Sequence, residues 1–540
     1  MTLTSLSDTP AARALAAANF VRRYRWLILL GLITAAIMEV LDTTIVNVAL
    51  PQMAGNLNAT QEEIGWVSTG YILANVIFLP MTAFFASRFG RQRYLTASII
   101  LFIIASFLCG TSTSLTELVF WRVLQGAGGA ALLSTAQATL RQIFPQEEQG
   151  MVQAVFLLGV IVAPTLGPTL GGWITDNYTW NWCFFINVPI GIASAFLVTT
   201  FLRDPPDQQA HTGRVDWPGI GLLTVGIGSL QYVLEEGNAK DWFDDARILR
   251  LAMLAAVSLG TLIWWELHPR NAHPVVNFRV LRNKTLSAAL FLFVALGFGL
   301  YGGVFLFPLF AQGILHFTPT ETGLVMMPGG LATAASALMC GMLLNGKNPK
   351  ADPRVLILFG VVLFAVSMWI MGHLTTAAGE SDVRMALLVR GVGLGLLFVP
   401  INNVAYASIK PQDAQQASGL INLSRQLGGA FGIAVLLNQL SKQTQLHRVD
   451  LVSSIATGNA LADDRMRLLT AGFMARGMDA FAARQSALGV LNAQVQQQAT
   501  MLGFNDAWMF ILVVFVMVAP FILLLGRPNR RASAPAVDAH

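Results

Sequence analysis

Runs of about 20 apolar residues, separated by short polar breaks, recur along almost the whole chain. A helix of that length crosses about 30 Å of hydrocarbon, so each run predicts one membrane-spanning helix. The pattern therefore predicts an all-α membrane protein with about fourteen spans. They are placed at residues 26–50, 64–86, 94–112, 117–142, 151–174, 184–202, 216–235, 248–267, 285–311, 321–345, 354–373, 383–409, 416–440 and 506–526.

Lysine and arginine residues fall in alternate loops between these spans. Residues 22–25 hold three arginines before the first span, and residues 88–93 hold three after the second, whereas the loop 51–63 between them has neither lysine nor arginine. Residues 527–531, after the last span, again hold three arginines. Because short loops that stay in the cytoplasm carry the positive excess, both termini are expected to be cytoplasmic.

The composition agrees with a membrane protein and argues against other classes. Hydrophobic residues make up 54% of the 540 residues and charged residues only 12%, against roughly 25% charged residues in soluble domains. The net charge of +5 is distributed among loops, which argues against nucleic-acid binding. The three cysteines lack CxxC spacing, so no metal site is predicted, although a bridge between Cys109 and Cys183 stays open. The polar, basic start lacks a small-residue cleavage site, so we expect no removable signal peptide.

The first six and the last six spans are expected to form two related halves, as in transporters built from repeats. Residues 121–140 can be laid over residues 389–409, which places Arg122 over Arg390 and Ser134 over Asn402. The two spans between 216 and 267 have no counterpart and are expected to be an insertion. The predicted units are a cytoplasmic arm (1–25), a first six-helix half (26–202), a linker with two inserted helices (203–284), a second six-helix half (285–526) that includes a long extracytoplasmic loop (441–505), and a cytoplasmic tail (527–540).

Two carboxylates interrupt the first span, in the stretch MEVLDTTIVNVALP (38–51). Glu39 and Asp42 are three residues apart, so they are expected to share one helix face, with Asn47 at its edge. A carboxylate near the bilayer centre costs about 2.5–3.5 kcal/mol even on the lenient insertion scale, so this face is expected to point into the bundle. Burial favours the neutral form, which makes such a group a candidate proton carrier. A structural ion pair with Arg122 of the fourth span is the alternative, and the two roles can coexist.

Small residues recur at every fourth position of the fifth span, in GVIVAPTLGPTLGGWI (159–174). Such a stripe lets a neighbouring helix approach closely, and prolines between its members loosen the backbone. Static close packing and a hinge both agree with the pattern. The set comprises Gly159, Ala163, Pro164, Gly167, Pro168, Gly171 and Gly172.

Polar side chains inside other spans are expected to face one another or a central cavity, because they cannot face lipid. They either hold helices together or contact a substrate. The basic turn SRFGRQR, with Arg88, Gly90 and Arg91, is explained by cytoplasmic retention alone. The candidates for a substrate cavity are Asn47, Gln137, Asn402, Asn403, Tyr406, Arg425 and Gln426.

With these residues the chain resembles the fourteen-helix drug:proton antiporters of the major facilitator superfamily, the EmrB-type branch. The motifs that carry the resemblance are LDTTIVNVALP (41–51), RVLQGAGGA (122–130), APTLGPTLGGWI (163–174), WNWCFFINVPIG (180–191) and GLINLSRQLGGAFG (419–432).

The resemblance implies a proton-coupled multidrug efflux antiporter that exports hydrophobic or amphipathic compounds by alternating access. The energy source is then the proton gradient, and no cofactor or metal is needed. By the same resemblance Asp42 and Arg122 take part in proton coupling, with Glu39 as a further candidate beside them. The members of the fifth-span set that correspond to the antiporter motif are Gly167, Pro168, Gly171 and Gly172.

One motif departs from the family pattern. The cytoplasmic loop of the superfamily usually reads Gly-x-Leu-Ala-Asp-Arg-x-Gly, and here Ala83 and Ser87 replace its Gly and Asp. A charge-based latch at this turn is therefore not expected.

The resemblance also implies a multi-pass protein of the bacterial inner membrane. Such pumps can work with a periplasmic adaptor protein and an outer-membrane channel. The expected contact is the segment 441–505, in which the stretch FAARQSALGVLNAQVQQQATML (481–502) is expected to be helical. Export of one endogenous metabolite, such as a fatty acid or siderophore, stays open as an alternative function. A membrane enzyme or redox subunit is disfavoured, because all seven histidines fall in loops, near span ends or in tails.

Overall fold

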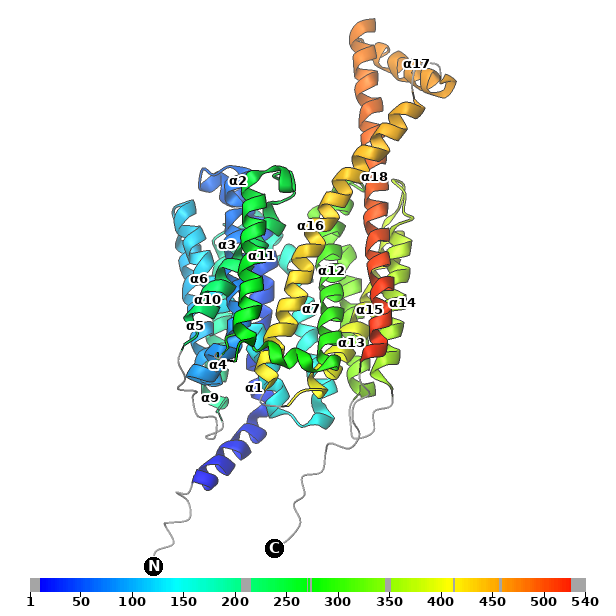
Figure 1. Cartoon of the computed structure of the whole chain (residues 1–540). Helices are drawn as coiled ribbons and strands as arrows, with labels where there is room; N and C mark the ends of the chain where they lie inside the picture. Colours follow the sequence, from blue (N-terminus) through cyan, green and yellow to red (C-terminus); the bar gives the residue numbers. More distant parts are fainter. Residues whose placement is uncertain are drawn as a thin grey trace, which may run out of the picture.

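The chain folds into a long helical bundle from which one helical hairpin projects (Figure 1). This computed structural model describes residues 10–204, 215–269, 271, 274–344, 351–410, 413–455 and 459–525. We call the side on which α1 begins and η6 ends the arm side, and the opposite side, where α17 lies, the α17 side (Figure 1).

The first half of the chain supplies the helices that correspond to the first six predicted spans. A short 3-10 turn with Pro80 divides the second of these, because proline cannot donate the backbone hydrogen bond that a continuous helix needs. The elements are α1 (Pro10–Asn56), α2 (Gln61–Ile64), α3 (Trp66–Phe78), η1 (Leu79–Met81), α4 (Thr82–Phe89), α5 (Arg91–Thr111), α6 (Leu115–Ile143), α7 (Gln149–Asn177), α8 (Trp182–Phe185) and α9 (Asn187–Phe201).

The remaining helices correspond to the two inserted spans and the last six. Side-chain caps mark several of their starts: Asp216 accepts from the backbone of Gly219, and Asn283 accepts from Thr285 and Leu286. The elements are α10 (Trp217–Glu236), α11 (Ala246–Leu267), α12 (Lys284–Gly313), α13 (Pro319–Leu344), α14 (Pro353–Met371), α15 (Glu380–Ala407), α16 (Ala414–Ser454), α17 (Ala460–Met474), α18 (Ala480–Val518) and η6 (Ala519–Leu524).

The predicted all-α membrane fold is confirmed. Within the described residues, 12 helical segments are long and apolar enough to cross a membrane. The two other predicted spans are represented by α6 and α7, each of 29 residues. The count of fourteen spans and the cytoplasmic position of both termini stay predictions.

Helix packing repeats between the two halves. In the first half α1 packs on α7, while α3 and α5 pack on α6; in the second half α12 packs on α16, while α13 and α14 pack on α15. The halves meet where α13 packs on α7 and where α16 packs on α6. The inserted helices α10 and α11 pack on each other, and α10 also contacts α3.

Glycines at the closest helix contacts show which residues of the first half correspond to which residues of the second half. A Cβ on Gly126 would lie 2.2 Å from the carbonyl oxygen of Tyr71 in α3, and a Cβ on Gly391 would lie 2.1 Å from that of Gly329 in α13. Two residues further along, Gly128 meets α5 and Gly393 meets α14 in the same way. Laying these glycines over each other places Arg390 over Gln125. The sequence overlay, which placed Arg122 over Arg390, is therefore wrong by three residues, or about one helical turn.

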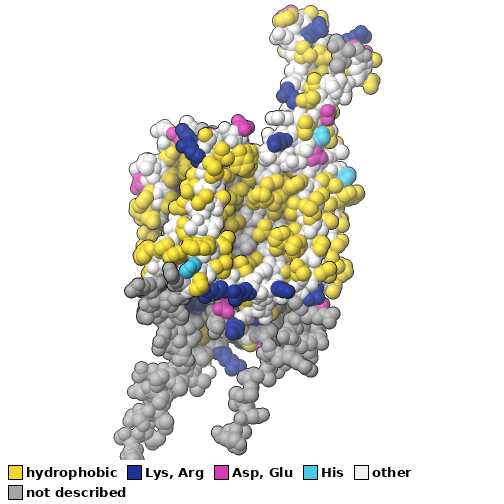
Figure 2. Space-filling view, viewed as in Figure 1, with side chains coloured by type: hydrophobic (Ala, Val, Ile, Leu, Met, Phe, Trp, Pro, Cys, Tyr) yellow, Lys and Arg dark blue, Asp and Glu magenta, His cyan; other side chains and the backbone are white. Residues whose placement is uncertain are grey.

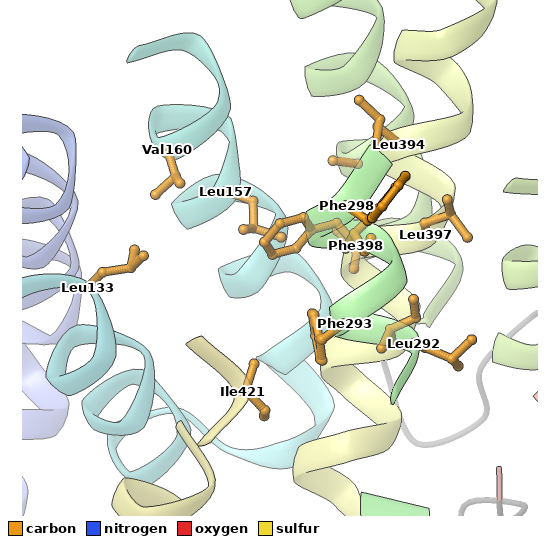
Figure 3. Packing of buried hydrophobic residues seen from close by; sticks show 14 of the residues in the cluster. Leu133, Leu157, Val160, Leu292, Phe293, Phe298, Leu394, Leu397, Phe398 and Ile421 are labelled. Carbon is orange, nitrogen blue, oxygen red and sulfur yellow. The ribbon is translucent and has the colours of Figure 1, made fainter. Parts of the chain in front are cut away.

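Apolar side chains from both halves pack together where the halves meet (Figure 3). Leu157 of α7 points toward Phe398 of α15, while Leu394 and Leu397 of α15 lie farther from α7 (Figure 3). On the face shown in Figure 2 a belt of apolar side chains crosses the bundle, and lysine and arginine side chains gather along its arm-side edge.

Segment 441–505, which we expected to lie outside the membrane and to contain a helical stretch at residues 481–502, is largely helical. Helix α16 continues to Ser454, α17 spans Ala460–Met474, and α18 begins at Ala480. The sequence FAARQSALGVLNAQVQQQATML is rich in Ala, Gln and Leu, which favour helix even where the surface is polar. The two helices therefore extend beyond the apolar belt as a hairpin (Figures 1 and 2).

Candidate functional site

Asp42 lies inside the first half, where it accepts hydrogen bonds from two other helices. Arg122 of α6 donates from Nη1 to Oδ2 at 2.5 Å, and Gln125 donates from Nε2 to Oδ1 at 2.9 Å. Asn187 of α9 donates a third bond to Oδ1 at 2.8 Å. The Asp42 side chain is fully buried. Because both oxygens act only as acceptors, the arrangement suits an ionised carboxylate.

Arg122 is held on every side. Its Nε donates to the backbone carbonyl of Val67 at 2.9 Å, and its Nη1 donates to Gln125 Oε1 at 2.9 Å. The guanidinium also lies over the ring of Tyr71, 4.3 Å from its centroid. The ion pair that sequence reasoning offered as an alternative role is thus present, and it involves Asp42 rather than Glu39.

Two further residues complete this site, and sequence reasoning assigned no role to either. Gln125 both accepts from Arg122 and donates to Asp42. Asn187 donates to Asp42 and to Ser106 Oγ, the latter at 3.1 Å. Both lie inside the quoted motifs RVLQGAGGA and WNWCFFINVPIG, and a polar residue within an apolar span was the available signal.

Glu39 lies at the contact between the two halves. Asn75 of α3 donates from Nδ2 to Glu39 Oε1 at 3.3 Å, and Asn75 Oδ1 accepts from Gln426 of α16 at 3.2 Å. The positive charge of Arg425 is close enough to act on Glu39. Glu39 Oε2 is buried and has no hydrogen-bond partner among the described residues.

The two acids therefore do not share one environment, although we expected them to share one face. Asp42 points toward α6 and α9, whereas Glu39 points toward α3 and the second half. Positions three apart on a helix differ by about 60° around its axis. Because several helices pack closely on α1, side chains that differ by this angle contact different helices.

Polar side chains tie the two halves together from the middle of the bundle to its arm side. Asn422 of α16 donates to Gln137 of α6 at 3.0 Å and also accepts from Arg425 at 2.9 Å. In the described parts of the two halves, no hydrogen bond joins them on the α17 side. The other bonds between the halves run from Gln426 to Asn75, Ser418 to the Ser134 carbonyl, Gln415 to Thr135, and Arg141 to the Tyr406 carbonyl.

The remaining candidates for a substrate cavity are more scattered. Asn47 is exposed and accepts a hydrogen bond from Ser68 Oγ at 2.7 Å. Asn402 is buried and donates back to the carbonyl of Phe398 in its own helix. Asn403 is half-buried, and the hydroxyl of buried Tyr406 has no hydrogen-bond partner among the described residues. The structure brings together only Gln137, Arg425 and Gln426 of the predicted set in one polar layer.

The stripe of small residues on α7 faces α1 in the arrangement seen here. A Cβ on Gly167 would lie 1.9 Å from Thr44 Oγ1, and one on Gly171 would lie 2.8 Å from the carbonyl oxygen of Ile45. Ala163 is buried, and Gly159 meets Ile33 and Ile37. Gly172 has open space around its Cβ position, so it does not contribute to this close approach. The side chains of Pro164 and Pro168 lie outside the described residues.

The basic turn contains an ion pair that sequence reasoning did not expect. Asp204, which follows α9, accepts from the backbone of Gln92 and lies 3.4 Å from Arg91 Nε. Arg91 also donates to Gln142 at the end of α6. Gly90 has φ +87°, and a Cβ there would approach Asp204. A distant acid thus supplies the negative charge that Ser87 lacks, and Arg88 lies nearby on α4.

Cys109, Cys183 and Cys340 are free and buried, so the bridge left open between the first two is not formed. Among the described residues, no group of three or more His, Cys, Asp or Glu side chains could hold a metal ion. An apolar pocket of about 610 Å³ lies between α3, α4 and α10, and Arg88 and Thr224 are the polar residues in its lining. It contains none of the residues predicted for the substrate cavity.

Comparison with known proteins places this chain in a family. Residues 32–433 match the model of the Major Facilitator Superfamily. The chain is 34% identical to the multidrug export protein EmrB of Haemophilus influenzae over 438 residues, covering 81% of this chain and 84% of that protein. It is 32% identical to the fatty acid resistance protein FarB of Neisseria gonorrhoeae over 500 residues, covering 92% and 96%.

Solved structures agree with the fold. The proton:xylose symporter XylE, bound to 6-bromo-6-deoxy-D-glucose, superimposes with a TM-score of 0.59 at 13% identity, covering 93% of this chain and 95% of that one. At that identity the likeness concerns the fold alone. The chain is therefore a membrane transporter that belongs to the major facilitator superfamily and, within it, to the EmrB-type branch of multidrug export proteins.

Proposed function

We propose that this protein is a proton-driven exporter of hydrophobic or amphipathic compounds. The observation that carries the proposal is the buried Asp42 and Arg122 pair, with Glu39 less than one turn away at the contact between the halves. An acid held away from water is a natural proton carrier, because protonation neutralises a charge that burial disfavours. Similarity to the EmrB protein of Haemophilus influenzae supports the choice of substrates.

Proton coupling requires that proton affinity differ between conformations. In the arrangement seen here Asp42 has three donors, so its ionised form is well satisfied. If α1 and α6 shift relative to each other and Arg122 leaves, the same carboxylate becomes an isolated buried charge and takes up a proton. We propose that this exchange links proton entry to alternating access.

Alternating access also requires interfaces that open and close. The halves are joined by hydrogen bonds on the arm side, so the arrangement agrees with one closed toward that side. The close contact of Gly167 and Gly171 with α1 is a second interface on which a change in helix position would act. Proton movement down a 100 mV potential supplies about 2.3 kcal/mol per charge.

The test is transport by purified protein in proteoliposomes with an imposed pH gradient. We expect substrate accumulation in the wild type and at least a tenfold slower rate for Asp42→Asn. Asp506→Asn is the matched control, because Asp506 pairs with His447 at a half-exposed position on α18. Gradient-driven transport at the normal rate by Asp42→Asn would overturn the carrier role.

A second candidate function is export of one endogenous metabolite, such as a fatty acid or siderophore. Similarity to the fatty acid resistance protein FarB over almost the whole chain supports it. Metabolite profiling of a deletion strain distinguishes the two functions, because accumulation of one compound without altered drug tolerance would favour the specialised exporter.

We further propose that the protein lies in a bacterial inner membrane, with both termini in the cytoplasm, and that the projecting hairpin contacts a periplasmic adaptor protein. The hairpin bears exposed apolar side chains, Leu461, Leu468 and Phe481 among them, which suit a protein contact. Cross-linking in intact cells from positions 461 and 468 tests this contact, and the outer-membrane channel would be recovered with the adaptor.

A further inference from the structure

Arg390 is a buried cation of the second half that the proposed proton coupling does not use. It lies on α15, about 15 Å from the end of that helix on the α17 side, and therefore near the middle of the bundle. Its side chain is 8% exposed. Nη1 is buried and has no hydrogen-bond partner among the described residues, and no described carboxylate pairs with the guanidinium.

Among the described residues of the second half, no acid neutralises this charge within the membrane. In the described parts of its helices, Glu321, Glu380 and Asp382 lie in first turns near the α17 side. Asp506 of α18 is occupied by His447. Glu39 of the first half is hydrogen-bonded to Asn75 and lies near Arg425.

Helix α12 leaves room for the guanidinium. A Cβ on Gly303 would lie 3.0 Å from Arg390 Nη1, so a larger residue there would press on the charged group. Glycine at this position therefore leaves space for the guanidinium of Arg390 and provides no side chain that could pair with it. A buried charge without a partner is costly, and an ion of opposite sign bound beside it would lower that cost.

The side chains next to Arg390 along α15 are apolar and buried. Leu394 and Phe398 follow it on α15 at intervals of one turn toward the arm side, and Phe298 of α12 and Leu157 of α7 lie beside them (Figure 3). When the two halves part during alternating access, a molecule that places an anionic group at Arg390 would lay an apolar body along this cluster. That combination is the chemistry of an amphipathic anion.

We propose that Arg390 binds the anionic headgroup of amphipathic substrates and so gives this exporter a site for organic anions, such as long-chain carboxylates or sulfonates. The inference rests on the proposed export function and names one of its substrate classes. Arginine suits the role because its fork of donors matches two oxygens of a carboxylate or sulfonate. The absence of hydrogen bonds between the described parts of the halves on the α17 side agrees with release toward that side.

The experiment compares two dyes that differ only in their charged headgroup, which is anionic in one and cationic in the other. The full chain is reconstituted in proteoliposomes with a pH gradient, and transport is measured for a dansyl dye with an alkyl sulfonate and for the same dye with an alkyl trimethylammonium group. Loss of one charged hydrogen bond costs about ten- to hundredfold in affinity. We expect Arg390→Gln to raise the half-saturation concentration for the sulfonate dye at least tenfold and to leave the ammonium dye unchanged.

Two further variants keep the result interpretable. Arg384→Gln is the matched control, because Arg384 lies on the same helix, is exposed and pairs with Glu380. Arg390→Lys keeps the charge and loses the fork, so we expect a smaller rise for the sulfonate dye and none for the ammonium dye. Each variant is first checked for a single symmetric peak in size-exclusion chromatography.

The outcomes separate this inference from the proposed function. If the wild type transports only the ammonium dye, the export function stands and the anion site is wrong. If it transports neither dye under the gradient, nor any of a panel of lipophilic drugs, the export function itself fails. Equal loss of both dyes in Arg390→Gln, or wild-type transport of both dyes in Arg390→Lys and Arg390→Gln, would overturn the assignment of Arg390.

Discussion

Glu39 and Asp42 lie less than one turn apart on α1 and meet different parts of the molecule. Asp42 is enclosed by one half, with donors from α6 and α9 on both of its oxygens. Glu39 faces the other half through Asn75 and Gln426, and its second oxygen has no partner among the described residues. One carboxylate is satisfied as an anion, and the other is not.

The difference separates two tasks that the sequence places on one helix. A satisfied buried ion pair is stable until one of its partners moves, so Asp42 is suited to report the position of α6 relative to α1. A carboxyl with a free oxygen at the contact between halves is suited to exchange a proton when the halves separate or a substrate arrives. We expect substitutions at the two acids to differ more in their effect on the free energy of unfolding than in their effect on transport.

The largest effect is expected from breaking the Asp42 pair. Arg122→Gln leaves a buried carboxylate without its cation, and we expect it to lower the free energy of unfolding by about 3–5 kcal/mol. Adding Asp42→Asn should recover part of that loss, because the unpaired charge is removed, while gradient-driven transport stays absent. Thermal unfolding of the single and double variants in one detergent measures these changes in stability, and transport is measured separately in proteoliposomes. Additive losses of stability in the double variant would contradict a direct pair.

A smaller effect is expected at the helix contact beside this pair. Gly171→Ala places a Cβ against the carbonyl oxygen of Ile45, so we expect a loss of about 1–3 kcal/mol in stability and slower transport. Gly172→Ala is the control, because the space around its Cβ is open. Equal unfolding temperatures of the two variants would contradict the claim that the close contact between α7 and α1 stabilises the protein.

At Glu39 we expect little change in stability. Glu39→Gln keeps an oxygen that accepts from Asn75, so the free energy of unfolding should stay within about 1 kcal/mol of the wild type. Gradient-driven transport should nevertheless fall about tenfold or more, because an amide cannot carry the proton. A variant as unstable as Arg122→Gln would show that Glu39 is part of the same structural ion pair.

The smallest effect concerns an exposed carboxylate that serves as a reference for the buried ones. Hydrogen bonds from the backbone N–H and hydroxyl of Thr60 lower the pKa of Glu63 below its ordinary value of 4.5. A lowered pKa in the folded state means that the stabilisation is complete above the ordinary value and is lost as the pH falls below it. Glu63→Gln should therefore change stability slightly at pH 7 and not at pH 3, as thermal unfolding at both pH values can check.

Sequence periodicity predicted the positions of the helices well, because apolar length in lipid leaves few alternatives to a helix. It also indicated a helical stretch at residues 481–502, but it could not predict how far α16 continues beyond the membrane. The Asp42 and Arg122 pair was foreseeable from two charges inside apolar spans. Asn187 was not, because a neutral amide carries a weaker signal and its partner depends on how α9 packs on α1.

Proton release on substrate binding tests the account most directly. Purified protein in weakly buffered detergent is mixed with substrate, and a pH indicator reports the protons released. We expect release from the wild type, less from Glu39→Gln and from Asp42→Asn, and none from the variant with both substitutions. Unchanged release from the double variant would mean that the acids of α1 do not exchange the transported proton.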